Sequence, residues 1–152
     1  MVDIDTLQKV AGEKMITRSE EYSDIPGTYL FDKRACSTGY HLNMFCMSLM
    51  KDENRKKFLA GEADYLDDYS LTAAQRRGIL DRNWLKLIQE GGNIYYVAKL
   101  GATCGFSFED LAASMSGMTK ETYRGMMLSG GRPVEGNRSK AGRAFPGMER
   151  NS

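Results

Sequence analysis

The stretch EGGNIYYVAKL, residues 90–100, decides the fold of this chain. Gly91 and Gly92 end one helical pattern, because consecutive glycines readily adopt the backbone conformations that close a helix. Asn93 follows at once, and its side chain is among the preferred caps for the first turn of a helix. The stretch therefore predicts a tight reversal between two helices, the second of which runs to about Leu100.

Before this reversal, apolar residues recur at spacings of three and four, as on helices that face a core. The first such helix begins after Ser37, with apolar positions at Leu42, Phe45, Cys46, Leu49 and Met50. A second, charged helix follows, with expected buried positions at Phe58, Leu59, Tyr65 and Leu66. A capping box of Thr72 and Gln75 predicts one further helix, which runs through Ile79, Leu80, Leu85 and Ile88.

After the reversal, capping residues predict two more helices. Ser107 and Asp110 form a second capping box, and Thr119 caps a last helix that ends before Gly130. Because no stretch alternates apolar and polar residues as a strand would, we expect an all-α protein. It is a single irregular multi-helix domain with extended terminal arms. The expected parts are an N-terminal arm or peripheral helix over residues 1–23, a helical domain over residues 24–131 and a C-terminal tail over residues 132–152.

Composition and charge exclude several classes of function. The chain has 152 residues, 41% of them hydrophobic and 27% charged, which is typical of one globular domain. A net charge of +1 attracts no nucleic acid, and no run of about 18 to 20 apolar residues could span a membrane. The first five residues, MVDID, are acidic where a secretory signal is basic. We therefore expect a cytoplasmic protein that binds neither nucleic acid nor membrane.

The titratable residues argue against a metal centre or a thiol site in this chain. His41 is the one histidine of the sequence, and its position in a helical pattern favours a hydrogen-bonded structural role. One histidine is too few to build a histidine-based metal centre. Cys36, Cys46 and Cys104 lack the spacing of a zinc site or a disulfide framework. A thiol enzyme using Cys46 or Cys104 is disfavoured, because nothing nearby supplies an activating base.

Several stretches of the sequence together resemble one protein family. They are DIPGT (24–28), GYHLNMFCMSLM (39–50), ENR (53–55), YLD (65–67), LT (71–72), EGGNIY (90–95), SMSGMT (114–119) and GGR (130–132). In order and spacing, over roughly residues 24–140, they resemble the small (alpha) subunit of protocatechuate 4,5-dioxygenase, a type II extradiol ring-cleavage dioxygenase. A likeness of this extent is far more specific than a single short motif.

The resemblance implies an activity that is shared between two kinds of subunit. The enzyme would open the ring of protocatechuate between carbons 4 and 5 with O2, giving 4-carboxy-2-hydroxymuconate semialdehyde. The large (beta) subunit would hold the non-haem Fe(II) through two histidines and a glutamate, and two small and two large chains would assemble. This chain would carry no catalytic and no metal-binding residue. It would be helical and cap the mouth of the partner's active site.

The candidate for a lid over the substrate entrance is the segment of Phe106, Ser107 and Phe108 that follows Gly105. Gly105 frees the loop, Ser107 begins a helix, and the family has an aromatic residue near the entrance at the position of Phe108. Such a ring would cover a bound catechol and exclude water. An ordinary core position in the first helical turn is the equally weighted alternative for Phe108.

Asn93 and Tyr95 are secondary candidates for a contact with the substrate. For Asn93 a helix cap is the favoured role. Tyr95 and Tyr96 are adjacent, so one should pack inward and the other outward. Whether the substrate is protocatechuate, gallate or another catechol stays open, because most substrate contacts would lie on the large subunit.

A non-catalytic helical protein-interaction module is the alternative function. The helices over residues 72–100 have the lengths of a helix-turn-helix, but the low net charge and the apolar helix over residues 94–100 argue against DNA binding. Ring opening that depends on O2 and on an added large subunit would separate the two functions.

Overall fold

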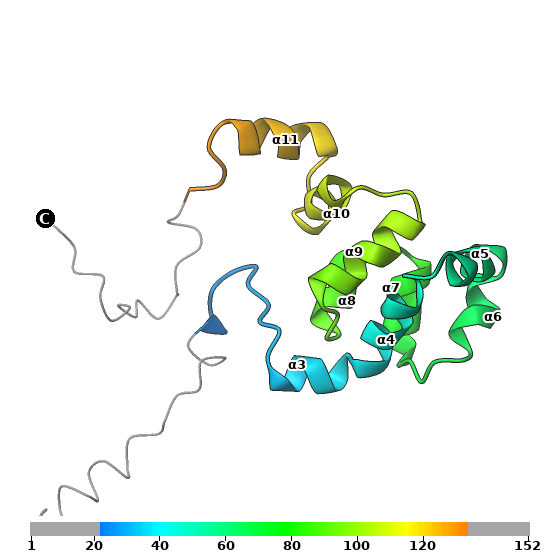
Figure 1. The fold of residues 1–152 in the computed structure, drawn as a ribbon. Helices are drawn as coiled ribbons and strands as arrows, with labels where there is room; N and C mark the ends of the chain where they lie inside the picture. Colours follow the sequence, from blue (N-terminus) through cyan, green and yellow to red (C-terminus); the bar gives the residue numbers. More distant parts are fainter. Residues whose placement is uncertain (1–21, 134–152) are drawn as a thin grey trace, which may run out of the picture. The chain divides into compact units, whose positions relative to one another are not determined.

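Nine helices and no strand make up residues 22–133, the part of the chain that the computed structural model describes (Figure 1). The prediction of an all-α protein is confirmed. Residues 31–133 form one compact unit, and residues 22–30 belong to a separate one. The expected arm over residues 1–23 and tail over residues 132–152 lie almost wholly outside the described residues. Within residues 22–133, no helix has the length and apolar character needed to cross a membrane.

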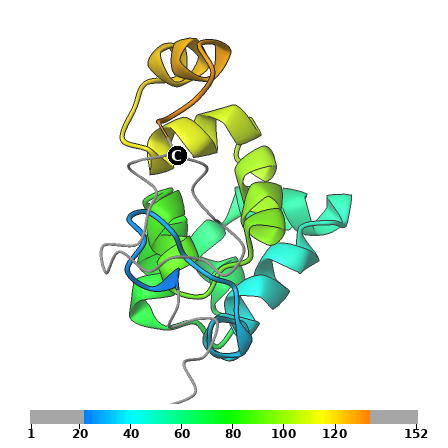
Figure 2. The ribbon, with the colours of Figure 1, turned by 90° about the vertical axis from the view of Figure 1, so that its left-hand side faces the viewer.

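The helices are short and follow one another through tight links. They are α3 (Lys33–Thr38), α4 (Tyr40–Ser48), α5 (Asp52–Ala60), α6 (Glu62–Leu66), α7 (Ala73–Leu80), α8 (Trp84–Gln89), α9 (Ile94–Thr103), α10 (Phe108–Met115) and α11 (Lys120–Leu128). The capping boxes predicted at Thr72 and at Ser107 are both present. Figures 1 and 2 show α10 and α11 at one end of the compact unit, away from α5 and α6.

Two helices that the sequence predicts as continuous are divided in the structure. Gly61 separates α5 from α6, and a break at Arg82 and Asn83 separates α7 from α8. Arg82 has a left-handed φ of 55°, and the Asn83 amide donates to the Gly78 carbonyl at 2.9 Å. The Asn83 side chain then accepts from the Lys86 amide at 3.0 Å and begins α8. One asparagine thus closes one helix and caps the next.

Three later links use the same backbone device. In each, a glycine with positive φ follows the helix, and the next amide donates back across the last turn, a Schellman motif. These bonds run from Gly92 to Leu87 at 2.8 Å, from Phe106 to Gly101 at 2.9 Å and from Met118 to Ala113 at 3.0 Å. The next residue along, Asn93, Ser107 or Thr119, caps the following helix. The reversal predicted at residues 90–93 is confirmed.

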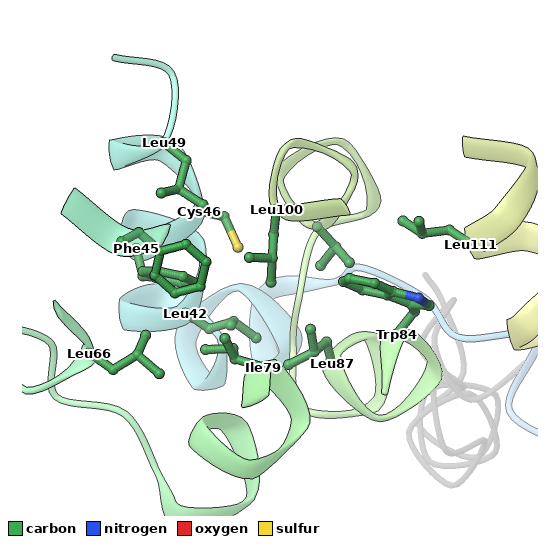
Figure 3. Packing of buried hydrophobic residues seen from close by; sticks show 12 residues of the cluster. Leu42, Phe45, Cys46, Leu49, Leu66, Ile79, Trp84, Leu87, Leu100 and Leu111 are labelled. Atoms are coloured by element: carbon green, nitrogen blue, oxygen red, sulfur yellow. The ribbon is translucent and has the colours of Figure 1, made fainter. Parts of the chain in front are cut away.

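The hydrophobic core lies among α4, α7, α8 and α9, with one side chain from each of α5, α6 and α10 (Figure 3). Its members are Leu42, Phe45, Cys46, Leu49, Phe58, Leu66, Ile79, Trp84, Leu87, Val97, Leu100 and Leu111. Full burial of each large apolar side chain stabilises the fold by about 1.5–3 kcal/mol. This core gives α9 a fixed support on one side, with α10 continuing from its end.

Two predicted core positions are wrong, because Met50 and Leu59 are exposed. Each directly follows a buried residue, Leu49 or Phe58, and Leu80 is likewise exposed after buried Ile79. Successive helical residues point about 100° apart, so two neighbours rarely face the same core. In each case the periodicity of the sequence indicated two adjacent apolar residues and did not distinguish which of the two is buried.

Asn43 ties α4 to the link between α8 and α9. Its side chain is buried, and its Nδ2 donates to the Gly91 carbonyl at 3.0 Å. Its Oδ1 accepts from the Asn93 amide at 2.8 Å. A buried amide side chain is tolerated when its polar groups are paired in this way. The same two bonds satisfy backbone groups of a buried turn.

The buried Gln75 side chain forms a second set of hydrogen bonds next to the link between α8 and α9. Its Nε2 donates to the carbonyls of Thr38 and Glu90, at 3.1 Å each. Its Oε1 accepts from the Thr72 amide at 3.0 Å, as the capping box requires. Gln75 therefore joins the end of α3, the end of α8 and the start of α7.

The backbones at Gly39 and Gly91 approach too closely for any side chain at the crossing. A Cβ atom on Gly39 would lie 1.8 Å from the Gly91 carbonyl oxygen. A Cβ atom on Gly91 would lie 2.6 Å from the Ala35 carbonyl oxygen, and Gly91 has a left-handed φ of 88°. The glycines are required here by contact, and at Gly91 also by conformation.

We predict that Gly39→Ala lowers the free energy of unfolding by about 2–3 kcal/mol or more, because backbone must move to admit the methyl group. Gly125→Ala is the matched control, since a Cβ atom on Gly125 would meet nothing within 4 Å in this chain. It should leave stability unchanged or raise it by up to about 1 kcal/mol. Urea unfolding followed by circular dichroism measures both. Equal stability of Gly39→Ala and the unmodified chain would contradict the crossing.

Candidate functional site

The α9–α10 turn presents two aromatic side chains on either side of a helix cap. Gly105 has a φ of 86°, and Ser107 caps α10. Phe106 is partly exposed, and its ring packs edge-on against buried Trp84, with 5.5 Å between ring centroids. Phe108, the first residue of α10, is 61% exposed. Phe108 is therefore not a core residue of this chain, whereas Phe106 is anchored to the core.

The capping box between these rings is reinforced by a lysine from α11. The Asp110 carboxylate accepts from the Ser107 amide at 2.7 Å and from the Ser107 hydroxyl at 2.6 Å. Lys120 Nζ lies 2.9 Å from Asp110 Oδ1 and 3.3 Å from Ser107 Oγ. The hydrogen bonds from Ser107, followed by that from Lys120, lower the pKa of Asp110 from its ordinary 3.8 to about 2.

A second ion pair fixes α11 beside the same turn. Arg124 Nε donates to Glu109 Oε1 at 2.9 Å, and Arg124 Nη2 donates to Glu109 Oε2. This bidentate contact lowers the pKa of Glu109. Glu109 directly follows Phe108, so the first two turns of α11 lie against the first turn of α10.

Lys120, Arg124 and Glu109 were not predicted as part of the site. Their signal in the sequence is charge placement: acidic residues in the first turn of one helix and basic residues in the first two turns of the next. Such placement is common on solvated helices, and it indicates a contact only when the helices are known to meet.

Asn93 is a helix cap, as favoured from the sequence. Its Oδ1 accepts from the Tyr95 amide at 2.9 Å, and its own amide donates to Asn43. Tyr95 is 78% exposed, whereas Tyr96 packs against the core, which confirms that the two point in different directions. The ten residues of α9 separate Asn93 from the α9–α10 turn by about 15 Å. The five predicted site residues therefore form two groups, one at each end of α9.

The described residues do not fit an iron site. Among residues 22–133, no group of three or more histidine, cysteine, aspartate or glutamate side chains is arranged to hold a metal ion. His41 is exposed, and its ring lies edge-on to Tyr40 at 5.2 Å between centroids. Among the described residues, the His41 side chain makes this ring contact in place of the expected hydrogen bond. No step of a reaction on iron is assigned to this part of the chain.

Cys46 and Cys104 are unsuited to nucleophilic chemistry. Cys46 is buried, and its burial raises the pKa of the thiol to about 12. Burial also raises the pKa of Cys104, although the charge of Arg82 acts in the opposite direction. Because the thiolate is the reactive form, both cysteines would be largely unreactive at neutral pH.

Comparison with known proteins gives these features a family. Residues 42–128 match the family model described as aromatic-ring-opening dioxygenase LigAB, LigA subunit. The chain belongs to this family. The matched range begins in α4, ends with the last residue of α11 and includes Asn43 and the whole α9–α10 turn. The resemblance to the small subunit of a ring-cleaving dioxygenase, drawn from the sequence, is confirmed.

A curated relative is similar to about two thirds of this LigA-family chain. It is gallate dioxygenase from Pseudomonas putida, 28% identical over 99 residues. The match covers 65% of this chain and 29% of the relative. The chain thus spans under a third of the length of that relative.

We predict that Lys120→Met raises the pKa of Asp110, because it removes one of the groups that stabilise the carboxylate. Lys56→Met is the control, since Lys56 pairs with Asp52 and should leave Asp110 unchanged. NMR titration of the side-chain carboxyl measures both. A lowered pKa means that the contribution of the capping box is present above pH about 4 and is lost as the pH falls toward 2. An ordinary aspartate pKa in the unmodified chain would contradict this geometry.

Proposed function

We propose that this chain is the small (alpha) subunit of a non-haem Fe(II) extradiol dioxygenase that cleaves protocatechuate at the 4,5 position with O2. The product would be 4-carboxy-2-hydroxymuconate semialdehyde. The observation that carries the proposal is the family match over residues 42–128, which includes the exposed aromatic turn. Gallate is the second candidate substrate, because the relative from Pseudomonas putida is named a gallate dioxygenase.

The iron would belong to a large (beta) subunit, with two small and two large chains in the assembly. Three observations support this division. The family description names LigA as a subunit of LigAB. The relative is a much longer chain, with room for a second domain beside the matched segment. This sequence contains one histidine, which is too few for a facial triad. When bound by the partner, the iron would supply the activation of O2 and of the catechol.

The residues of this chain would shape the entrance of that site. Phe108 projects from a helix start that is held by the Ser107–Asp110 box and by two ion pairs to α11. Phe106 is held by its contact with Trp84. A ring carried by such a pre-organised turn can cover a bound catechol and exclude water with little ordering cost. Asn93 and Tyr95 would act at most as secondary contacts, and Tyr95 is the more accessible of the two.

The alternative, a non-catalytic helical protein-interaction module, rests on the exposed apolar side chains of the described residues, such as Tyr95 and Phe108. Both the interaction module and the dioxygenase subunit would dock a partner protein. The two differ in whether the docked complex cleaves a catechol ring.

The test of the proposal is O2 uptake with protocatechuate and Fe(II), on this chain alone, on the large subunit alone and on the two co-expressed. We expect ring cleavage, with a yellow product, in the co-expressed sample and none from this chain alone. Activity of this chain by itself would refute the division between subunits. A stable complex without ring cleavage of protocatechuate, gallate or other catechols would favour the interaction module.

We predict that Phe108→Ala, in the assembled enzyme, raises the KM for protocatechuate by roughly threefold to tenfold or changes the preference among catechols, because an apolar contact at the entrance is lost. The iron content should not change. Tyr40→Ala is the control, since Tyr40 is an exposed aromatic residue at the start of α4, outside the turn. Steady-state kinetics on several catechols measure the effect. Unchanged constants for Phe108→Ala on all of them would rule out the lid.

A further inference from the structure

The last helix, α11, has an exposed face that the described chain leaves uncovered. None of its nine residues is buried, and it packs mainly against α10. Figures 1 and 2 show it at the end of the compact unit, beyond α10. Leu128 is 83% exposed and Met127 is 52% exposed. Helices shorter than about 12 to 15 residues are marginal by themselves, so α11 depends on its contacts.

The two basic residues of α11 are engaged on the side of α10. Lys120 pairs with Asp110, and Arg124 pairs with Glu109. Because these charges are balanced locally, the helix offers no cationic surface for nucleic acid or for an anionic membrane. The remaining exposed surface holds Gly125 and Leu128 with one carboxylate, Glu121, a turn before Gly125. A mixed apolar and acidic face of this kind fits the surface of another protein.

Gly125 points to a close approach at this face. Glycine inside a helix is less favourable than alanine by about 1 kcal/mol. A Cβ atom on Gly125 would meet nothing within 4 Å, so nothing within the described chain requires a glycine there. Gly125 and Leu128 are three residues apart and therefore lie on the same side of α11. A glycine beside an exposed leucine makes a shallow depression next to a projecting side chain, into which a second surface can pack.

The family match indicates which protein covers this face. The matched range ends at Leu128, the last residue of α11, so the helix belongs to the part of the chain that this family shares. The family description makes this chain one subunit of a LigAB enzyme. The matched relative is more than three times as long as the segment that corresponds to this chain. A shared helix without buried residues is explained if the other subunit buries it.

We propose that the α11 docking face, defined by Gly125 and Leu128 with exposed Glu121 beside them, is a contact surface for the large catalytic subunit. The Leu128 side chain would enter an apolar groove of that subunit, and the partner's backbone or side chains would pack over Gly125. This inference rests on the proposed function. Docking through α11 would hold α10 and the aromatic turn in place over the large subunit.

The test measures association of the full-length chain with the large subunit by analytical ultracentrifugation, with ring cleavage as a second readout. Leu128→Arg and Gly125→Leu should each raise the Kd at least tenfold. Leu59→Arg is the matched control, because Leu59 is a leucine 55% exposed on α5, away from α11, and its Kd should stay within twofold. At saturating concentrations of the variants, activity should return, since the aromatic turn is intact.

Three outcomes would overturn the inference, and they can be told apart from failure of the proposed function. Unchanged binding by both α11 variants, with an active wild-type complex, would overturn the docking face alone. A wild-type dimer of this chain that Leu128→Arg converts to a monomer, without loss of large-subunit binding, would assign the face to a second copy. Absence of any wild-type complex would refute the proposed function and the docking face together. Thermal unfolding of each variant checks the fold, and Gly125→Leu should not lower stability.

Discussion

The hydrogen bonds of Asn43 to the α8–α9 link are the interaction on which the rest of the structure depends. Both polar groups of this buried side chain bind backbone atoms of one turn, Gly91 and Asn93. Loss of such a partner would leave a buried donor and acceptor unpaired, at a cost of about 1–3 kcal/mol for each. The contact is available only because Gly39 and Gly91 let the two backbones meet. The direction of α9 is thereby fixed relative to α4, and α9 leads directly to the aromatic turn.

From α8 onward, the chain repeats one kind of link between helices. A left-handed glycine closes each helix, and a capping residue two positions later opens the next. Because each link is only a few residues long and its backbone groups are hydrogen-bonded, the orientation of each helix limits that of its successor. The contact of Gly39 with Gly91 orients α9, and α9 in turn positions the turn that carries Phe108. The ion pairs between α10 and α11 hold the same turn from the side of α11. The proposed lid is held by contacts on both sides, from Trp84 and from α11.

Local signals in the sequence were sufficient for most of the caps and for the reversal at residues 90–93. The Thr72 and Ser107 boxes and the Gly91–Gly92 reversal were predicted because each depends on neighbours within four residues. The break at Arg82 was missed, since a left-handed arginine has no strong local signature and Asn83 was not considered as a cap. Met50 and Leu59 were misplaced because periodicity does not distinguish adjacent apolar residues. The salt bridges around Phe108 join separate helices, and a pattern within one helix cannot predict them.

We propose one explanation for the exposed residues of the aromatic turn and of the α11 docking face: the catalytic subunit covers both surfaces in the assembled enzyme. The most direct measurement is a crystal structure of the assembled dioxygenase with a catechol bound. We predict that the α9–α10 turn lies over the mouth of the partner's iron site, with the Phe108 ring in van der Waals contact with the substrate or its entrance, and that α11 is buried against the partner. A turn that faces solvent, far from the bound catechol, would contradict it.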